Sequence, residues 1–353
     1  MKKLLLITSL IFSLMFVSSC KNKNVVVKSV EENKTPIVTK APLTIKDYFI
    51  YNENSEYVYE GKGNEYASFN ILVDYLTENR VQIRSNNGGT EMIKVLENKD
   101  GKLTMLLSKG EIYYRENLIQ SPSNNEEILL KEPLIKGTSW TLSDNRKRYI
   151  SNIDVEVTTP LGKYKALEVT TENKEDKTLD YYAPNVGLVK TLFVVKDDEV
   201  SSSLSKVEKN KAFTQGVNFY YPNVNEDKLY FANKQLSFNT NDITKIIFEK
   251  AFKDLPKGDF GRVLGPNAKI KSLYLNKDNT VYVDFTSELI SEMNAGSGYE
   301  TMILQCITNT LGAYYGVDKV YITIENSPYS SGHIMMKKGE SFTVNYKDNV
   351  ELK

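Results

Sequence analysis

The chain has 353 residues and a formal net charge of zero, with 41% apolar and 25% charged residues. This composition is ordinary for a globular protein, and the charge balance argues against a nucleic-acid partner. One histidine and two cysteines are too few for a zinc site built from these ligands, and no metal or other cofactor is expected.

Residues 1–19 are predicted to be a targeting segment. Lys2 and Lys3 precede an apolar run, Leu4–Val17, which has the length of a signal-peptide core and is short for a membrane span. The run ends in Val-Ser-Ser-Cys20, which resembles the lipobox of bacterial lipoproteins. The resemblance implies that Cys20 is lipidated and anchors the protein to the outer face of the cytoplasmic membrane. An ordinary cleaved signal peptide is the alternative.

Residues 20–44 are predicted to be a flexible tether. They are rich in Lys, Asn, Glu and Thr, include Pro36 and Pro42, and show no sustained hydrophobic period. Cleavage before Cys20 removes two of the 45 basic residues, so that 43 remain against 45 acidic ones and the net charge becomes −2. With Cys20 lipidated, Cys306 is the one cysteine that remains, and no intramolecular disulfide is expected.

Residues 45–210 are predicted to form an antiparallel all-β domain. Apolar and polar side chains alternate in short runs, such as 67–75 and 153–157, and turn residues separate the runs. Two segments, Tyr57–Tyr66 and Tyr181–Lys190, resemble parts of other Gram-positive lipoproteins, and the second also resembles curved-sheet carriers of hydrophobic cargo. An open half-barrel that holds a lipid-like ligand is one alternative. A closed sheet filled by its own side chains is the favoured one.

Residues 215–346 are predicted to form an α+β domain in the order ββ-α-ββ-α-β, with two helices on one face of a sheet. Val217–Tyr221 and Lys228–Ala232 form the first predicted hairpin. Asn241 or Asp242 is expected to cap the helix that follows. The predicted apolar side of that helix consists of Ile243, Ile246, Ile247, Phe248, Ala251, Phe252 and Leu255.

The last predicted helix gives the strongest structural signal in the sequence. Ser297 and Glu300 have the spacing of a capping box, and Gly316 supplies a stop before a strand at 319–325. Gly312 inside the helix predicts the close approach of a strand or partner, because glycine is otherwise unfavourable there. Residues spaced by three and four predict one buried face: Tyr299, Met302, Ile303, Cys306, Ile307, Thr310, Leu311 and Tyr314. Cys306 is therefore expected to be a buried apolar residue.

Six segments of the second domain form a recognisable pattern: Asn218–Tyr221, Leu255–Gly258, Val281–Leu289, Gly296–Glu300, Asn309–Gly312 and Val317–Glu325. In these segments the domain resembles the GerMN domain of the GerM sporulation and germination lipoproteins. The resemblance implies a fold of the ring-building type, a non-enzymatic role, and a protein partner or a second copy of the chain. The motif positions, with structural roles, are Asp284, Gly296, Ser297, Gly298, Glu300, Asn309, Thr310 and Leu311.

Few residues suggest catalysis. His333 lies beside two serines in a predicted loop, but the spacing fits no nucleophile elbow, and an exposed polar histidine is favoured. Asp284, Glu288 and Glu292 could align for acid–base work or Ca²⁺ binding, although a solvated face or a helix cap is favoured. Anion binding by the amides of residues 296–298 is a further alternative, and capping is favoured over it.

The sequence therefore predicts a non-enzymatic lipoprotein that acts as a scaffold or assembly factor in sporulation or spore germination. The alternative is an envelope protein whose β domain holds a lipid-like or cell-wall ligand. The first interpretation predicts an exposed edge strand or apolar patch within residues 215–345. The second predicts a deep apolar pocket within residues 46–209.

Overall fold

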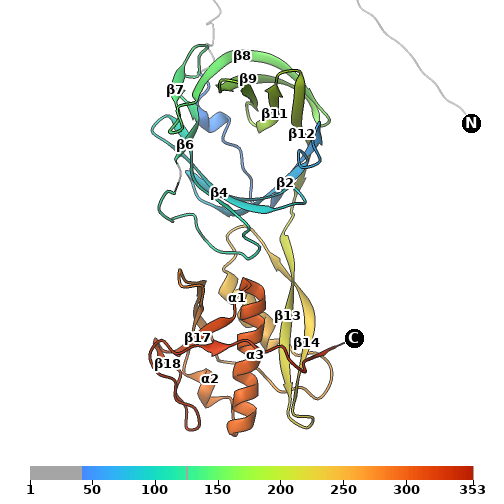
Figure 1. Cartoon of the computed structure of the whole chain (residues 1–353), viewed down its shortest axis with the longest axis vertical. Coiled ribbons are helices and arrows are strands. Elements are labelled where there is room, and N and C mark those ends of the chain that lie inside the picture. The colour runs from blue at the N-terminus through green and yellow to red at the C-terminus, as the bar shows by residue number, and fades with distance from the viewer. Residues whose placement is uncertain (1–41, 125, 353) are drawn as a thin grey trace, which may run out of the picture. The chain divides into compact units, whose positions relative to one another are not determined.

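Two groups of strands follow each other along the chain (Figure 1). The computed structural model describes residues 42–124 and 126–352, so the predicted signal peptide, Cys20 and most of the predicted tether lie outside the described residues. The chain from Leu43 onward forms one compact unit. Within the described residues, no helix has the length and apolarity that a membrane span requires.

Twelve antiparallel strands form the first sheet, which curls into a nearly closed ring (Figure 1). The pairing order is β6-β5-β4-β3-β2-β1-β12-β11-β10-β9-β8-β7, so almost every strand pairs with its neighbour in the chain, as short turns require. The predicted antiparallel β architecture is confirmed. The strands are β1 Ser55–Lys62, β2 Phe69–Leu76, β3 Arg80–Asn86, β4 Glu91–Lys99, β5 Lys102–Gly110, β6 Glu127–Lys131, β7 Ser139–Thr141, β8 Lys147–Thr159, β9 Gly162–Glu172, β10 Asp176–Ala183, β11 Gly187–Val195 and β12 Asp198–Lys209.

Among the described residues, side chains join the two ends of this sheet, and no hydrogen-bonded ladder does. Trp140 Nε1 on β7 and Arg148 Nη1 on β8 donate to the carbonyl oxygen of Ile128 on β6, at 2.9 and 2.8 Å. Arg148 also forms an ion pair with Glu127 at 2.6 Å. These contacts engage polar groups of an edge strand that would otherwise be open to pairing with another chain.

The segment before β1 lies within the ring of strands (Figure 1). It contains a short 3₁₀-helix, Ile45–Asp47, whose Ile45 side chain is buried together with Tyr48. The amide of Asn185 donates to the carbonyl oxygen of Asp47 at 2.7 Å, and the amide of Ile45 donates to Glu132 at 3.0 Å. These bonds hold the segment against the inner wall of the sheet.

The second group of strands forms two sheets with helices between them. The sheets contain β13 Phe213–Asn223, β14 Lys228–Phe238 and β20 Val350–Glu351, and β15 Ile270–Leu275, β16 Val281–Phe285, β17 Lys319–Ile324, β18 Ser327–Pro328 and β19 Phe342–Thr343. The helices are α1 Thr244–Lys253, α2 Glu288–Ser291 and α3 Ser297–Tyr315. The predicted single sheet is therefore wrong: α1 contacts β14 and β15, and α3 contacts β13, β16 and β17.

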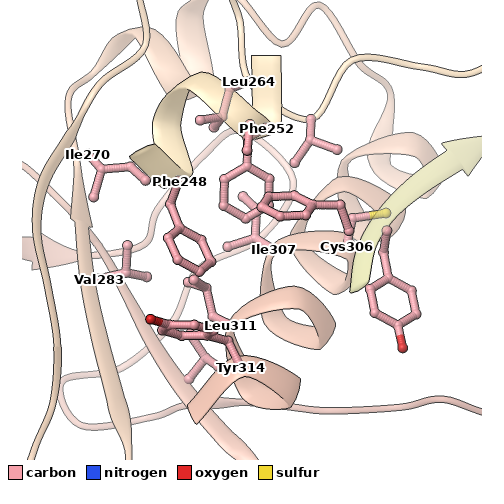
Figure 2. Packing of buried hydrophobic residues seen from close by; sticks show 14 of the residues in the cluster. Phe248, Phe252, Leu264, Ile270, Val283, Cys306, Ile307, Leu311 and Tyr314 are labelled. Carbon is pink, nitrogen blue, oxygen red and sulfur yellow. The ribbon is translucent and has the colours of Figure 1, made fainter. Parts of the chain in front are cut away.

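The core of this part lies around α1 and α3 (Figure 2). Phe248 and Phe252 of α1 pack with Ile307 and Leu311 of α3, and all four side chains are buried. Cys306 is fully buried, which confirms the expectation of a buried apolar residue, and burial raises the pKa of its thiol. The predicted single buried face of α3 is too narrow, because Leu304, Thr308 and Tyr315 are buried as well. A helix packed between two sheets is covered on both sides.

Two predictions for α1 are wrong. Ile243 and Ile246 were expected in the core, but 54% and 53% of their surfaces are exposed. Asn241 does not cap α1: its Oδ1 accepts from the amide of Leu76 at 2.9 Å and its Nδ2 donates to the carbonyl of Leu76. Asp242 likewise accepts from the amide of Asn239 at 2.7 Å. Asn241 is therefore engaged by a strand distant in sequence, and Asp242 by the amide of Asn239 in the turn before the helix, so neither side chain caps α1.

Arg115 connects the two groups of strands. Its guanidinium is completely buried between the rings of Tyr75 and Phe238, with centroids at 4.3 and 5.2 Å. It donates to the carbonyl oxygens of Asp74 and Asn239, at 2.8 and 2.9 Å, and to that of Asp242. One buried side chain on the β5–β6 connection thus satisfies backbone groups from both parts of the chain.

Candidate functional site

The interior of the twelve-stranded sheet contains a cavity of about 470 Å³. The sheet is nearly closed, as favoured above, but the prediction that its own side chains fill it is wrong. About eight strands enclose a space that side chains can fill, whereas larger closed sheets leave room for a ligand. The cavity wall is largely apolar, and its apolar members include Phe69, Ile71, Ile83, Met92, Leu96, Leu103, Met105, Leu129 and Leu188.

Four charged side chains lie in or beside this cavity. Lys94, Glu127 and Asp180 line it, and Arg148 neutralises Glu127 in the ion pair at 2.6 Å. Burial lowers the pKa of Lys94, and it raises the pKa of Asp180, which accepts a hydrogen bond from Thr191 Oγ1 at 2.7 Å. An apolar space with a few placed polar groups is the usual composition of a small-molecule site.

Glu300 does not form the predicted capping box. The N-cap of α3 is Gly296, with no side-chain cap, and the Glu300 carboxylate instead accepts from Tyr329 at 2.7 Å and Ser331 at 2.5 Å. Its second oxygen lies 2.7 Å from His333 Nδ1. Burial alone would raise the pKa of Glu300, but the hydrogen bonds from these three side chains outweigh it and lower the pKa.

The Glu300 cluster does not form a catalytic triad. His333 and Ser331 both bind the same carboxylate, so His333 Nδ1 does not act as a base toward the Ser331 hydroxyl. His333 is exposed, as predicted, while its pairing with Glu300 was not predicted. The cluster fastens the loop after β18 to the first turns of α3. Gly298 is surrounded by open space, and Ser297 lies in the first turn.

Asn309 and Gly312 receive the C-terminal segment of the chain. Asn309 Nδ2 donates to the carbonyl oxygen of Asn345 at 2.6 Å, and Asn309 Oδ1 accepts from the amide of Asn345 at 2.8 Å. A Cβ on Gly312 would lie 2.3 Å from Val344, so the predicted close approach is confirmed, with a segment of the same chain. Thr310 Oγ1 accepts from the amide of Tyr220 at 3.2 Å, and Leu311 is fully buried.

Asp284 holds the turn between β17 and β18. Its Oδ1 accepts from Thr323 Oγ1 at 2.7 Å and from the amide of Asn326 at 2.8 Å. Glu292 instead accepts from Asn267, so the structure does not bring Asp284 and Glu292 together in one site. Among residues 42–124 and 126–352, no group of three His, Cys, Asp or Glu side chains could hold a metal ion.

Comparison with known families matches residues 218–330 to a family described as "Germane: Sporulation and spore germination". Residues 218–330 are a Germane domain. The predicted resemblance to the GerMN domain is thereby confirmed for this part of the chain. The Germane domain covers the region from β13 to the loop after β18 and includes every motif position predicted above.

Solved structures provide further similarities. The tandem GerMN domains of the sporulation protein GerM from Bacillus subtilis are 21% identical, with a TM-score of 0.29, over 37% of this chain and 46% of that chain. An exported protein with a YmcC-like fold from Bacteroides fragilis is 14% identical, with a TM-score of 0.28, over 46% of this chain and 99% of that one. This chain thus spans less than half of the tandem GerM structure. The search of curated proteins returned no match.

The cavity and its charged residues lie outside the Germane domain. The sequence analysis kept a pocket in the β domain only as the less favoured alternative, and it missed the charged residues. The sequence of β4, Met92-Ile-Lys-Val-Leu96, contained one signal: a lysine interrupts an apolar run. Ile93 and Val95 are buried beneath the loop after β5, whereas Met92 and Lys94 line the cavity. A strand with both faces covered reads as continuously apolar, and a charge within it then stands out.

Proposed function

We propose that the protein is a non-enzymatic, lipid-anchored envelope protein that acts as an assembly factor in sporulation or spore germination. The match to the Germane family supports a role in sporulation or spore germination. The lipobox-like sequence before Cys20 supports a lipid anchor and a location on the outer face of the cytoplasmic membrane. The Germane domain is the part that binds a protein partner or a second copy of the chain.

A row of three tyrosines on the Germane domain carries this proposal. Tyr274, Tyr282 and Tyr321 stand directly opposite one another on β15, β16 and β17. Their ring centroids are 5.6 and 5.1 Å apart, and 43% of the Tyr274 surface is exposed. Val281 and Val283 of β16 point to the opposite, buried face. Tyrosine is enriched at protein interfaces. β15 is an edge strand, and α1 already engages its first residues, because Glu249 accepts from the amide of Ile270 and Lys245 donates to the carbonyl of Lys271.

Charge substitutions in the tyrosine row test the assembly role. Tyr274→Lys and Tyr321→Lys should reduce sporulation or germination to the level of the deletion strain while the melting temperature changes little. Ile153→Lys is the matched control, because Ile153 is 50% exposed and lies on the β domain. If deletion of the whole protein causes a defect but both tyrosine variants behave as wild type, the tyrosine row is not the partner surface.

The β domain supports a second candidate function, the binding of an envelope ligand in its cavity of about 470 Å³. That volume lies within the range of small-molecule sites, about 300–1,000 Å³. Uptake of the neutral apolar dye N-phenyl-1-naphthylamine tests this function. The wild-type chain should increase the dye's fluorescence, and Leu103→Trp, which places a larger side chain in the wall, should prevent it.

A further inference from the structure

Lys94 is the only cationic side chain among the described residues that line the cavity. It lies on β4 between Met92 and Leu96, which also line the cavity. No described carboxylate forms an ion pair with its Nζ, and no described acceptor forms a hydrogen bond with it; Glu127 and Asp180 act on it only through longer-range attraction. A cation in an apolar space loses hydration and needs a partner of opposite charge.

The acidic groups that face Lys94 are already engaged. Glu127 is bound to Arg148 at 2.6 Å, so its charge is balanced within the wall. Asp180 accepts from Thr191 Oγ1 at 2.7 Å, and burial raises the pKa of its carboxyl group. The remaining ionisable groups of the wall are tyrosines, which are neutral near pH 7. Among the described wall residues, Lys94 is therefore the one basic group that has no acidic partner in an ion pair and that a ligand would meet.

The rest of the wall selects an apolar ligand body. Ile71, Ile83, Leu103, Met105, Leu129 and Leu188 surround the space. Tyr66 also lines the cavity while 54% of its surface is exposed, so the cavity reaches the protein surface between the β1–β2 connection and the β3–β4 turn. A chain-like apolar molecule with one charged end fits both features.

We propose that the cavity binds an amphipathic anion, an apolar chain ending in a carboxylate or phosphate, with the anionic head beside Lys94. This assignment rests on ligand binding by the β domain, the second candidate function. Carboxylate and phosphate share the chemistry that Lys94 recognises, a compact anion that accepts hydrogen bonds from an ammonium group. A fatty acid and a phosphate-headed lipid are the two sources of such a group.

Displacement of bound N-phenyl-1-naphthylamine by ligands that differ only in the head tests the proposal. The chain is produced from residue 21 onward, without lipid, which keeps all described residues. Decanoate and decyl phosphate should displace the dye at concentrations about tenfold to a hundredfold lower than 1-decanol does, as expected for a hydrogen bond to a charged group. Lys94→Met should abolish that preference and retain dye binding, whereas Lys94→Arg should keep the preference.

Controls separate the two possible failures. Lys165→Met removes a lysine whose side chain is 74% exposed, and it should change nothing. Fluorescence of the buried Trp140 monitors folding, and Lys94→Gln replaces Lys94→Met if that variant unfolds.

Absence of dye uptake by the wild type would overturn ligand binding itself. Dye uptake with equal displacement by decanoate and decanol, or a preference that survives loss of Lys94, would overturn only the anionic head. Stronger displacement by decyl phosphate than by decanoate would support a phosphate-headed lipid.

Discussion

Replacing Arg115 by Met tests whether the β domain and the Germane domain unfold together. The variant keeps a long apolar side chain in a fully buried position but removes three donors to the carbonyl oxygens of Asp74, Asn239 and Asp242. The variant also breaks the buried ion pair between Arg115 Nε and Asp74 Oδ1, which are 3.8 Å apart. A hydrogen bond to a charged group contributes about 1.5–3 kcal/mol, and breaking a buried ion pair costs about 3–5 kcal/mol. Because Asp74 keeps its ion pair with Arg84 at 3.1 Å, the ion-pair loss should lie at the lower end of that range, and with three hydrogen bonds lost as well the variant should be destabilised by at least about 3 kcal/mol.

Two spectroscopic signals report on the two parts separately. Trp140, the only tryptophan, lies on β7, while the described α-helices lie between residues 244 and 315 and dominate the helical circular dichroism. In urea, the wild-type transitions of both signals should coincide. Arg115→Met should lower both midpoints and separate them. Arg146→Met is the control, because the Arg146 side chain is 35% exposed, and it should leave both midpoints unchanged.

Either of two results would refute this reasoning about Arg115. One is an Arg115→Met variant with unchanged midpoints and coincident transitions. The other is a wild type whose two signals already separate, which would support the sequence-based prediction of independently folding domains at 45–210 and 215–346. That prediction of domain boundaries is decided by this experiment.

Three further predictions concern single residues. Cys20→Ala should abolish acyl labelling and leave a released or unprocessed protein; unchanged labelling contradicts lipidation. Ile307→Asp places a charge in a fully buried position and should cost several kcal/mol, about the stability of a domain, whereas Lys319→Glu on an exposed position should leave the melting temperature nearly unchanged. Glu300 has a lowered pKa, so its carboxylate stabilises the fold above its ordinary pKa of 4.5, and this contribution is lost as the pH falls through the lower folded value. The stability difference between wild type and Glu300→Gln should therefore shrink below that pH, and a constant difference would contradict the assignment.

Local patterns in the sequence were enough to predict most elements of the Germane domain. The spacing of apolar residues and Gly316 predict α3, which ends with Gly316 in the left-handed conformation, and the alternation after it predicts β17. Such signals need only neighbours along the chain. The capping-box prediction was wrong because it also considered only sequence neighbours. Glu300 binds Tyr329, Ser331 and His333, which are about thirty residues away.

The cavity required information that no local pattern contains. Period-two alternation identifies strands but not how many of them curl into one sheet. The sheet closes because Trp140 and Arg148 meet Ile128 of a strand on the opposite edge. Twelve strands in one ring then leave an interior that the inward side chains cannot fill, and Lys94 becomes a wall residue although its sequence neighbourhood is apolar.

Strand β3 connects the cavity to the Germane domain through its two faces. Ile83 and Ser85 line the cavity, whereas Gln82 and Arg84 point the other way. Gln82 Nε2 donates to the carbonyl of residue 116 at 2.8 Å, and Arg84 donates to those of residues 112 and 114, at 2.9 and 3.0 Å. These bonds hold the loop that inserts Arg115 among backbone groups of residues 239 and 242. A ligand that orders β3 would therefore also order the residues before α1.

We accordingly expect ligand binding in the cavity to protect α1, Thr244–Lys253, against hydrogen exchange. Anything that binds only the folded β domain stabilises elements coupled to it, by an amount limited by the coupling free energy. Saturating decanoate should slow exchange in α1 of the wild type and have little effect there in Arg115→Met, while β3 is protected in both proteins. Equal protection of α1 in both proteins would show that the coupling does not pass through Arg115. Protection confined to β3 in the wild type would show that the cavity and the Germane domain respond independently.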